Sequence, residues 1–140
     1  HGRPPIAWAS HAWTSVEIND GEAVRREPTE WLNGRAIVTL LGIANPDAVR
    51  RQVQSAGATI AADVAVPDHA PHDAKTVRRL TAAIESGGAE AVLTTRKDWV
   101  KLRTVLDSGR LAVPVVVPEL RIQFIDGLDA LRSLVLGALD

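Results

Sequence analysis

Two short strings hold the side chains of this sequence that could do chemistry. They are PDHAPHD at residues 67–73 and TTRKD at residues 94–98. Each string lies where a predicted buried strand is followed by a predicted helix. Open α/β sheets bind their ligands at the carboxyl ends of their strands. The two strings therefore predict a functional site at that edge of a sheet.

The first string places Asp68 directly before His69, just after a predicted strand. A neighbouring carboxylate orients an imidazole and makes it a better general base or electrostatic helper. In the alternative interpretation, Asp68 binds loop amides and His69 packs as a half-buried ring. His72 is predicted to be a solvated loop residue, and Asp73 is predicted to cap the next helix.

The second string leads into a helix N-terminus, where free amides and the helix dipole favour an anion. Lys97 adds positive charge, so phosphate is the natural ligand, and Thr95, Lys97 and Asp98 are the candidate substrate-binding or phosphate-binding residues. The alternative is structural. Asp98 would then be the helix N-cap, Arg96 and Lys97 would be solvated, and the threonines would fill the strand end.

Apolar runs alternate with amphipathic segments after Gly34, and this pattern predicts the elements that position both strings. Strands are expected at residues 36–43, 59–66, 89–95 and 112–117. Helices are expected to bury Val49, Val53 and Ala56; Val77, Leu80 and Ile84; Leu102 and Val105, ending at Gly109; and, after Asp126, Leu128, Leu131 and Val135. Such a pattern is typical of a three-layer α/β/α Rossmann-like fold with a mainly parallel sheet of about four strands. With strand order 2-1-3-4, the switch point lies between Gly42 and Thr95.

The first part of the chain has a different pattern. Partial alternation over residues 6–18 and the turn signal Asn19-Asp20-Gly21 predict a two-stranded β ribbon. We therefore divide the chain into a ribbon or linker segment, residues 1–33, and a Rossmann-like α/β domain, residues 34–140.

Composition excludes several functions. Sixteen Lys and Arg stand against 17 Asp and Glu, with no block of like charge, so nucleic acid is not an expected partner. The absence of cysteine excludes disulfides, thiolate zinc sites and a Cys nucleophile. No apolar run approaches the roughly 20 residues of a transmembrane helix.

Nucleotide-binding motifs are absent from the sequence. Neither G-x-x-x-x-G-K-[ST] nor G-x-G-x-x-G occurs, so the chain has no nucleotide fingerprint of its own. A sequence without methionine is expected to be a piece of something longer.

Three ordered motifs carry a family resemblance. GIANP at residues 42–46, PDH at residues 67–69 and TTRKDWVKL at residues 94–102 resemble the carboxyl-terminal domain of tetraacyldisaccharide 4'-kinase, the lipid A 4'-kinase. The resemblance covers about residues 1–118. This sequence departs from the family pattern at several positions. It has Arg96 in place of the usual Glu, Ala70 in place of a common second His, and His72 at a position that is usually aromatic. Trp99 and Thr76 also replace the commoner Ala and Asp.

The resemblance implies a phosphotransferase of lipid A biosynthesis. In that family the γ-phosphate of ATP moves, with Mg²⁺, to the 4'-hydroxyl of a lipid A disaccharide precursor at the cytoplasmic face of the bacterial inner membrane. An amino-terminal P-loop domain holds ATP and the metal ion, and the second domain supplies the histidine of the Asp-His pair. By this resemblance His69 and Asp68 are catalytic, residues 6–25 form the interdomain linker, and this chain alone is inactive.

Two other functions remain open from the sequence. One is a stand-alone Rossmann-like module that binds an anionic small molecule through the amides near Asp98 and through Lys97. The other is a non-catalytic interaction domain with exposed Trp8, Trp13 and Trp31 as its contact surface.

Overall fold

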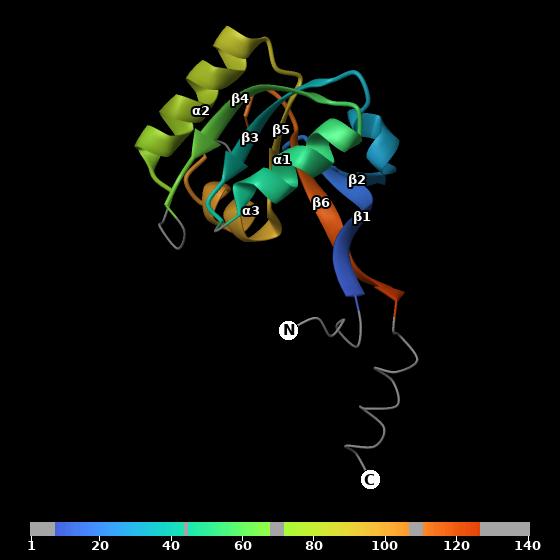
Figure 1. Ribbon diagram of the computed structural model, residues 1–140. Coiled ribbons are helices and arrows are strands. Elements are labelled where there is room, and N and C mark those ends of the chain that lie inside the picture. The colour runs from blue at the N-terminus through green and yellow to red at the C-terminus, as the bar shows by residue number, and fades with distance from the viewer. Residues whose placement is uncertain (1–7, 44, 68–71, 107–110, 127–140) are drawn as a thin grey trace. The chain divides into compact units, whose positions relative to one another are not determined.

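A computed structural model describes residues 8–43, 45–67, 72–106 and 111–126 of the chain (Figure 1). The chain divides into two compact units. One comprises residues 15–119, and the other comprises residues 1–14 together with residues 120–140. The side chains discussed below belong to residues 15–119 unless stated otherwise.

A mixed sheet of six strands, in the order β2-β1-β6-β5-β3-β4, forms the centre of the fold. The strands are β1 (Trp8–Asn19), β2 (Val24–Glu27), β3 (Ala36–Leu41), β4 (Thr59–Ala65), β5 (Ala91–Thr94) and β6 (Val115–Asp126). β3 pairs in parallel with both β4 and β5, and β5 pairs in parallel with β6. β1 and β2 pair antiparallel. The class is therefore α/β, and the predicted parallel order is confirmed as β4-β3-β5-β6.

The predicted ribbon exists, but it does not stand apart from the sheet. β1 lies next to β6 in the strand order, which raises the strand count from the expected four to six. Val16 and Ile18 of β1 are buried, and the Asn19 side-chain amide donates to the Val115 carbonyl at 3.4 Å. A two-stranded ribbon alone is marginal in water, and joining a larger sheet gives it an apolar face to bury. The division of the chain into a ribbon or linker segment, residues 1–33, and an α/β domain, residues 34–140, stays a prediction.

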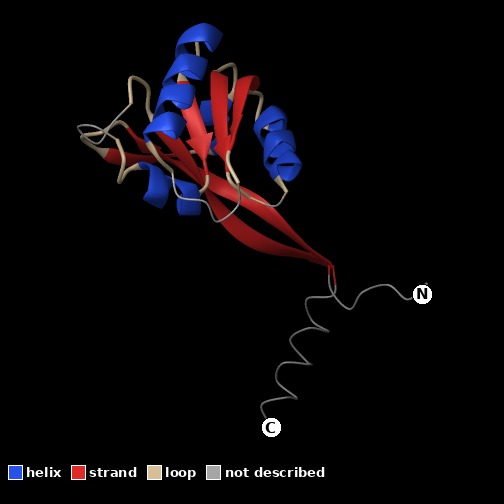
Figure 2. Cartoon of the chain, turned by 90° about the vertical axis from the view of Figure 1, so that its left-hand side faces the viewer, coloured by secondary structure: helices blue, strands red, loops and turns tan. Residues whose placement is uncertain are grey.

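In the described part of the chain, three α-helices cover the sheet, with α1 on one face and both α2 and α3 on the other (Figure 2). Their bounds are Pro46–Ser55, Ala74–Gly87 and Arg96–Leu102, and a short 3-10 helix, η1, spans Thr29–Leu32. The core on the side of α2 and α3 consists of Val38, Leu40, Val64, Leu80, Ile84, Ala89, Val92, Trp99, Leu102, Leu106, Val115 and Val117. Gly88 ends α2 with a φ of 59°, a left-handed conformation that glycine adopts without strain.

Some predicted boundaries are wrong. The last strand runs to Asp126, well beyond the expected end at residue 117. The third helix ends at Leu102, earlier than expected. Gly109 and the predicted final helix with Leu128, Leu131 and Val135 lie outside the described residues. Among the helices that are described, none has the length and apolar character that crossing a membrane would require.

Candidate functional site at the switch point

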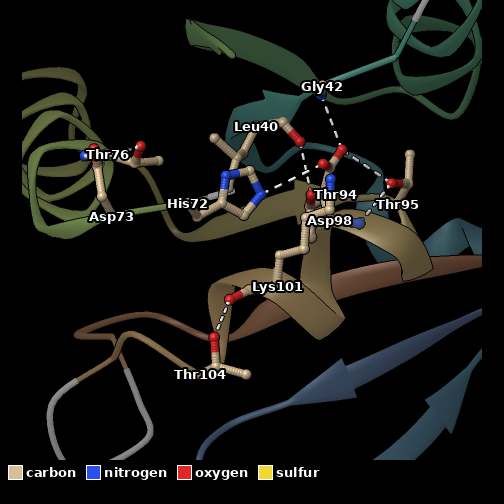
Figure 3. A network of polar contacts seen from close by, with 10 residues as sticks. All are labelled: Leu40, Gly42, His72, Asp73, Thr76, Thr94, Thr95, Asp98, Lys101 and Thr104. Carbon is tan, nitrogen blue, oxygen red and sulfur yellow. Dashed lines mark hydrogen bonds and ion pairs between the residues drawn. The ribbon is translucent and has the colours of Figure 1, made fainter. Parts of the chain in front are cut away.

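The switch point lies where β3 and β5 end side by side. Leu40 of β3 pairs with Thr94 of β5, and the Thr94 hydroxyl donates to the Leu40 carbonyl at 2.7 Å. Gly42 follows β3 and Thr95 follows β5, so both strands end before the expected bounds at residues 43 and 95. The predicted switch point between Gly42 and Thr95 is confirmed. Figure 3 shows the polar side chains that gather at this point.

Asp98 is the centre of this group. It is only 1% exposed, and its Oδ2 accepts hydrogen bonds from the Gly42 backbone N–H at 2.9 Å and from the Thr95 hydroxyl at 3.0 Å. A buried carboxylate requires such donors, because an ionised group without partners is strongly destabilising in the interior. Asp98 therefore joins the ends of β3 and β5 through one side chain.

The prediction that Asp98 is the N-cap of α3 is wrong. Thr95 is the N-cap, and its Oγ1 accepts the Asp98 backbone N–H at 3.2 Å. Asp98 is the third residue of the helix. Its carboxylate accepts a hydrogen bond from the hydroxyl of Thr95, the N-cap residue. This reciprocal arrangement is close to a capping box, in which the N-cap and the third helical residue satisfy each other's polar groups.

Gly42 permits this close packing because it has no side chain. A Cβ atom at this residue would lie 2.7 Å from Val66 Cγ2 and 2.9 Å from Asp98 Oδ1. It would also lie 3.5 Å from the Pro67 carbonyl oxygen, so the chain leaving β4 passes beside Gly42. Any larger residue would displace Asp98, Val66 or both.

The prediction that His72 is a solvated loop residue is also wrong. Its side chain is fully enclosed, and its Nε2 lies 3.4 Å from Asp98 Oδ1 (Figure 3). Neither ring nitrogen has a hydrogen-bond partner among the described residues. Only an indirect signal was available in the sequence, because it is a hydrophobic residue just before a helix N-cap that often packs against the helix.

Asp73 caps α2 as predicted. Its carboxylate accepts the Thr76 backbone N–H at 2.9 Å and the Thr76 hydroxyl at 3.1 Å. The backbone hydrogen bond from Thr76 is the main reason why the pKa of Asp73 lies below its usual value.

Arg96, the first residue of α3, forms a two-pronged ion pair with Glu17 of β1. Its guanidinium nitrogens lie 3.0 and 2.6 Å from the two carboxylate oxygens. The hydrogen bond from Arg96 lowers the pKa of Glu17, and the same contact raises the pKa of Arg96. The arginine is thus only partly solvated. Lys97, the next residue, is exposed.

This geometry limits what the switch point can bind. The Gly42 amide and the Thr95 hydroxyl, which could serve an incoming anion, already bind the Asp98 carboxylate. Within the part of the chain that the structure describes, no group of three or more His, Cys, Asp and Glu side chains could hold a metal ion. Asp68 and His69 lie outside the described residues.

The predicted tryptophan surface is only partly described. Trp13 and Trp31 are half-buried, and the Arg35 guanidinium lies 3.8 Å from the centre of the Trp31 ring. The side chain of Trp8 lies outside the described part. The Trp31 ring therefore already has a contact partner, Arg35, within this chain.

Comparisons with known proteins agree on one family. A family model described as LpxK, tetraacyldisaccharide-1-P 4'-kinase, matches residues 4–139. The tetraacyldisaccharide 4'-kinase of Geobacter metallireducens is 41% identical over 106 residues, which cover 76% of this chain and 31% of the relative. That of Anaeromyxobacter dehalogenans is 33% identical over an alignment of 141 residues, covering 99% of this chain and 35% of the relative. The chain thus spans about a third of the length of these curated relatives. No solved structure matches.

Proposed function

The chain belongs to the tetraacyldisaccharide-1-P 4'-kinase family, and from this membership we propose that it is the second domain of a lipid A 4'-kinase. The full-length protein would transfer the γ-phosphate of ATP to the 4'-hydroxyl of tetraacyldisaccharide 1-phosphate, at the cytoplasmic face of the bacterial inner membrane. The observation that carries this proposal is the family match over residues 4–139, together with relatives of which this chain covers only about a third.

We assign the Asp68-His69 pair as the catalytic contribution of this chain. His69 would help to activate the sugar hydroxyl, and Asp68 would orient the imidazole. The pair directly follows Pro67, whose carbonyl oxygen lies close to the Gly42 position at the switch point. This placement supports the assignment, because open α/β folds bind their ligands at that edge.

The residues that the structure describes do not fit ATP or Mg²⁺. The chain contains no phosphate-loop motif, and its described residues include no cluster of metal ligands. We therefore place both in an amino-terminal P-loop domain and assign no step to them here. Thr95 and Lys97 remain candidate contacts to the substrate or its phosphate, with Asp98 holding Thr95 in place.

The alternative of a stand-alone anion-binding module has less support. An anion at the switch point would have to compete with the Asp98 carboxylate for the Gly42 amide, and it would meet the negative charge of Asp98. Binding by such a module would stabilise the isolated chain. A clear rise of its melting temperature with a nucleotide or a sugar phosphate would favour the module over the kinase domain.

A kinetic experiment on the full-length protein tests the catalytic assignment. His69→Ala should lower kcat by roughly 10²–10⁴, the usual contribution of one general acid or base, while the affinity for ATP changes little. Arg78→Ala, which removes an exposed side chain of α2, is the control and should keep parental kinetics. Parental kcat in His69→Ala would remove this residue from the mechanism.

A further inference from the structure

Thr95 follows β5 at the switch point, and its hydroxyl makes two hydrogen bonds with one residue. The hydroxyl donates to Asp98 Oδ2 at 3.0 Å and accepts the Asp98 backbone N–H at 3.2 Å (Figure 3). The direction of the first bond follows from its partner, because the same Oδ2 accepts the Gly42 N–H at 2.9 Å. The hydrogen of the Thr95 hydroxyl is therefore used by Asp98.

These two bonds determine what the Thr95 hydroxyl can still offer to a ligand. A threonine hydroxyl has one hydrogen to donate and two lone pairs that accept. Asp98 uses the hydrogen and one lone pair, and the hydroxyl has no further partner among the described residues. One lone pair remains, so a group that binds this hydroxyl must bring a hydrogen. The oxygens of a fully ionised phosphate ester only accept hydrogen bonds, so they do not fit it.

The neighbouring donors at the ends of β3 and β5 are also in use. The Gly42 N–H binds Asp98, and the Thr94 hydroxyl donates to the Leu40 carbonyl at 2.7 Å. Thr94 is fully buried, whereas Thr95 is half-buried and can be reached from solvent. Thr95 therefore offers a ligand an acceptor at an edge where these donors are already paired.

We propose that Thr95 is a specificity-determining residue, which binds a sugar hydroxyl of the phosphate-accepting substrate and not a phosphate group. This inference rests on the proposed function, in which that substrate is a disaccharide. A sugar hydroxyl supplies the hydrogen that the remaining lone pair of Thr95 requires. The location supports the proposal, because open α/β folds bind their ligands at this edge of the sheet.

Deoxy analogues of the disaccharide test the proposal on the full-length protein. Each analogue lacks one free sugar hydroxyl, and its equilibrium Kd is compared with that of the intact substrate. For the parent, one analogue should bind roughly three- to tenfold more weakly, which is the effect of losing one uncharged hydrogen bond. In Thr95→Gly the same analogue and the intact substrate should differ by less than about twofold, because the partner of that hydroxyl is gone.

The variants are chosen to keep the helix intact. Glycine is well tolerated at a helix N-cap, and Thr95→Ala is a second removal variant with the same expected result. Thr95→Ser keeps the hydroxyl and should retain the parental preference. Thr104→Ala is the matched control near the other end of α3, where the Thr104 hydroxyl donates to the Lys101 carbonyl at 2.7 Å. It should also bind every analogue like the parent.

A substrate without its phosphate provides the second arm of the experiment. Removal of the phosphate should change the Kd by the same factor in the parent and in Thr95→Gly, because the Thr95 hydroxyl has no hydrogen left for a phosphate oxygen.

Three results would overturn the inference. They are a parent that binds all deoxy analogues as tightly as the substrate, removal variants that keep the parental preference, and a phosphate effect that disappears in Thr95→Gly. Failure of the proposed function has a different signature, because the full-length parent would then neither bind the disaccharide nor phosphorylate it.

Discussion

At the scale of single residues, the site depends on a glycine and a carboxylate that lie 56 positions apart in the sequence. Asp98 uses one oxygen to bind the Gly42 amide and the Thr95 hydroxyl, and its other oxygen faces His72. Hydrogen bonds to a charged acceptor are among the stronger ones in proteins. Gly42 is necessary because a side chain there would collide with the oxygen that faces His72.

Gly42→Ala should therefore destabilise the chain by about 1–3 kcal/mol, the usual effect of forcing an extra carbon into a packed site. The free energy of unfolding from urea titration measures this. Val66→Ala is the companion variant, since it removes the Cγ2 atom that the new Cβ would approach at 2.7 Å. The double variant should lose less than the sum of the two single variants, and strict additivity would contradict the proposed clash.

At the scale of elements, α3 is fixed at its N-terminus in two ways. The Thr95 cap and Asp98 join it to the ends of β3 and β5, and Arg96 joins it to Glu17 in β1. A second ion pair, Arg26 with Glu119, joins β2 to β6 with an Nε to Oε1 distance of 2.8 Å. These contacts attach the antiparallel strands to the parallel part of the sheet.

A double-mutant cycle on Glu17→Gln and Arg96→Ala measures the first ion pair. Half-exposed pairs contribute little, and we expect a coupling of about 0.2–1 kcal/mol at neutral pH, weaker in high salt. The pair Arg25 with Glu27, which lies within β2 and is more exposed, is the control and should show less coupling. Equal coupling in both pairs would argue against a specific role for Arg96.

The coupling free energy between Glu17 and Arg96 should decrease as the pH falls. The folded state lowers the pKa of Glu17, chiefly through the hydrogen bond from Arg96. The stabilisation from this carboxylate is therefore complete above its unfolded pKa and is lost as the pH falls through its lower, folded pKa. Urea titrations at successively lower pH should show the coupling disappear in acid.

At the scale of the whole molecule, the chain spans about a third of its curated relatives, and it contains no phosphate-loop motif. The proposal of a second domain explains both facts, because phosphate transfer requires groups that cradle the triphosphate, and these would lie in the rest of the protein. A closing second domain can deliver one catalytic group only when substrate is present.

The isolated chain should therefore give only background phosphate transfer from ATP to the lipid substrate. A radiolabel assay compares it with the full-length protein at equal molar concentration. A separately produced amino-terminal part, mixed with this chain, is the control for recovery of activity. Turnover by the isolated chain alone would show that the catalytic machinery is complete within these 140 residues.

The sequence by itself predicted the parallel strands and their order, the antiparallel ribbon and the three helices that the structure describes. The mostly apolar runs of β3 and β5 and the helical spacing of Val77, Leu80 and Ile84 are local patterns. They depend on near neighbours in the sequence, so their periodicity was sufficient. The motifs also indicated the family, which the family match confirms. Asp73 was correctly identified as a cap for the same local reason.

Only the tertiary structure decided which distant groups meet. The burial of His72, the contact of Asp98 with Gly42 and the place of β1 beside β6 all join residues far apart in the chain. Such pairings depend on how the faces of the sheet and the helices pack, and a local pattern of apolar and polar residues does not encode them. Asp98 shows this directly: its type and position fit a helix cap, but its carboxylate takes the nearest unpaired donors that the fold brings to it.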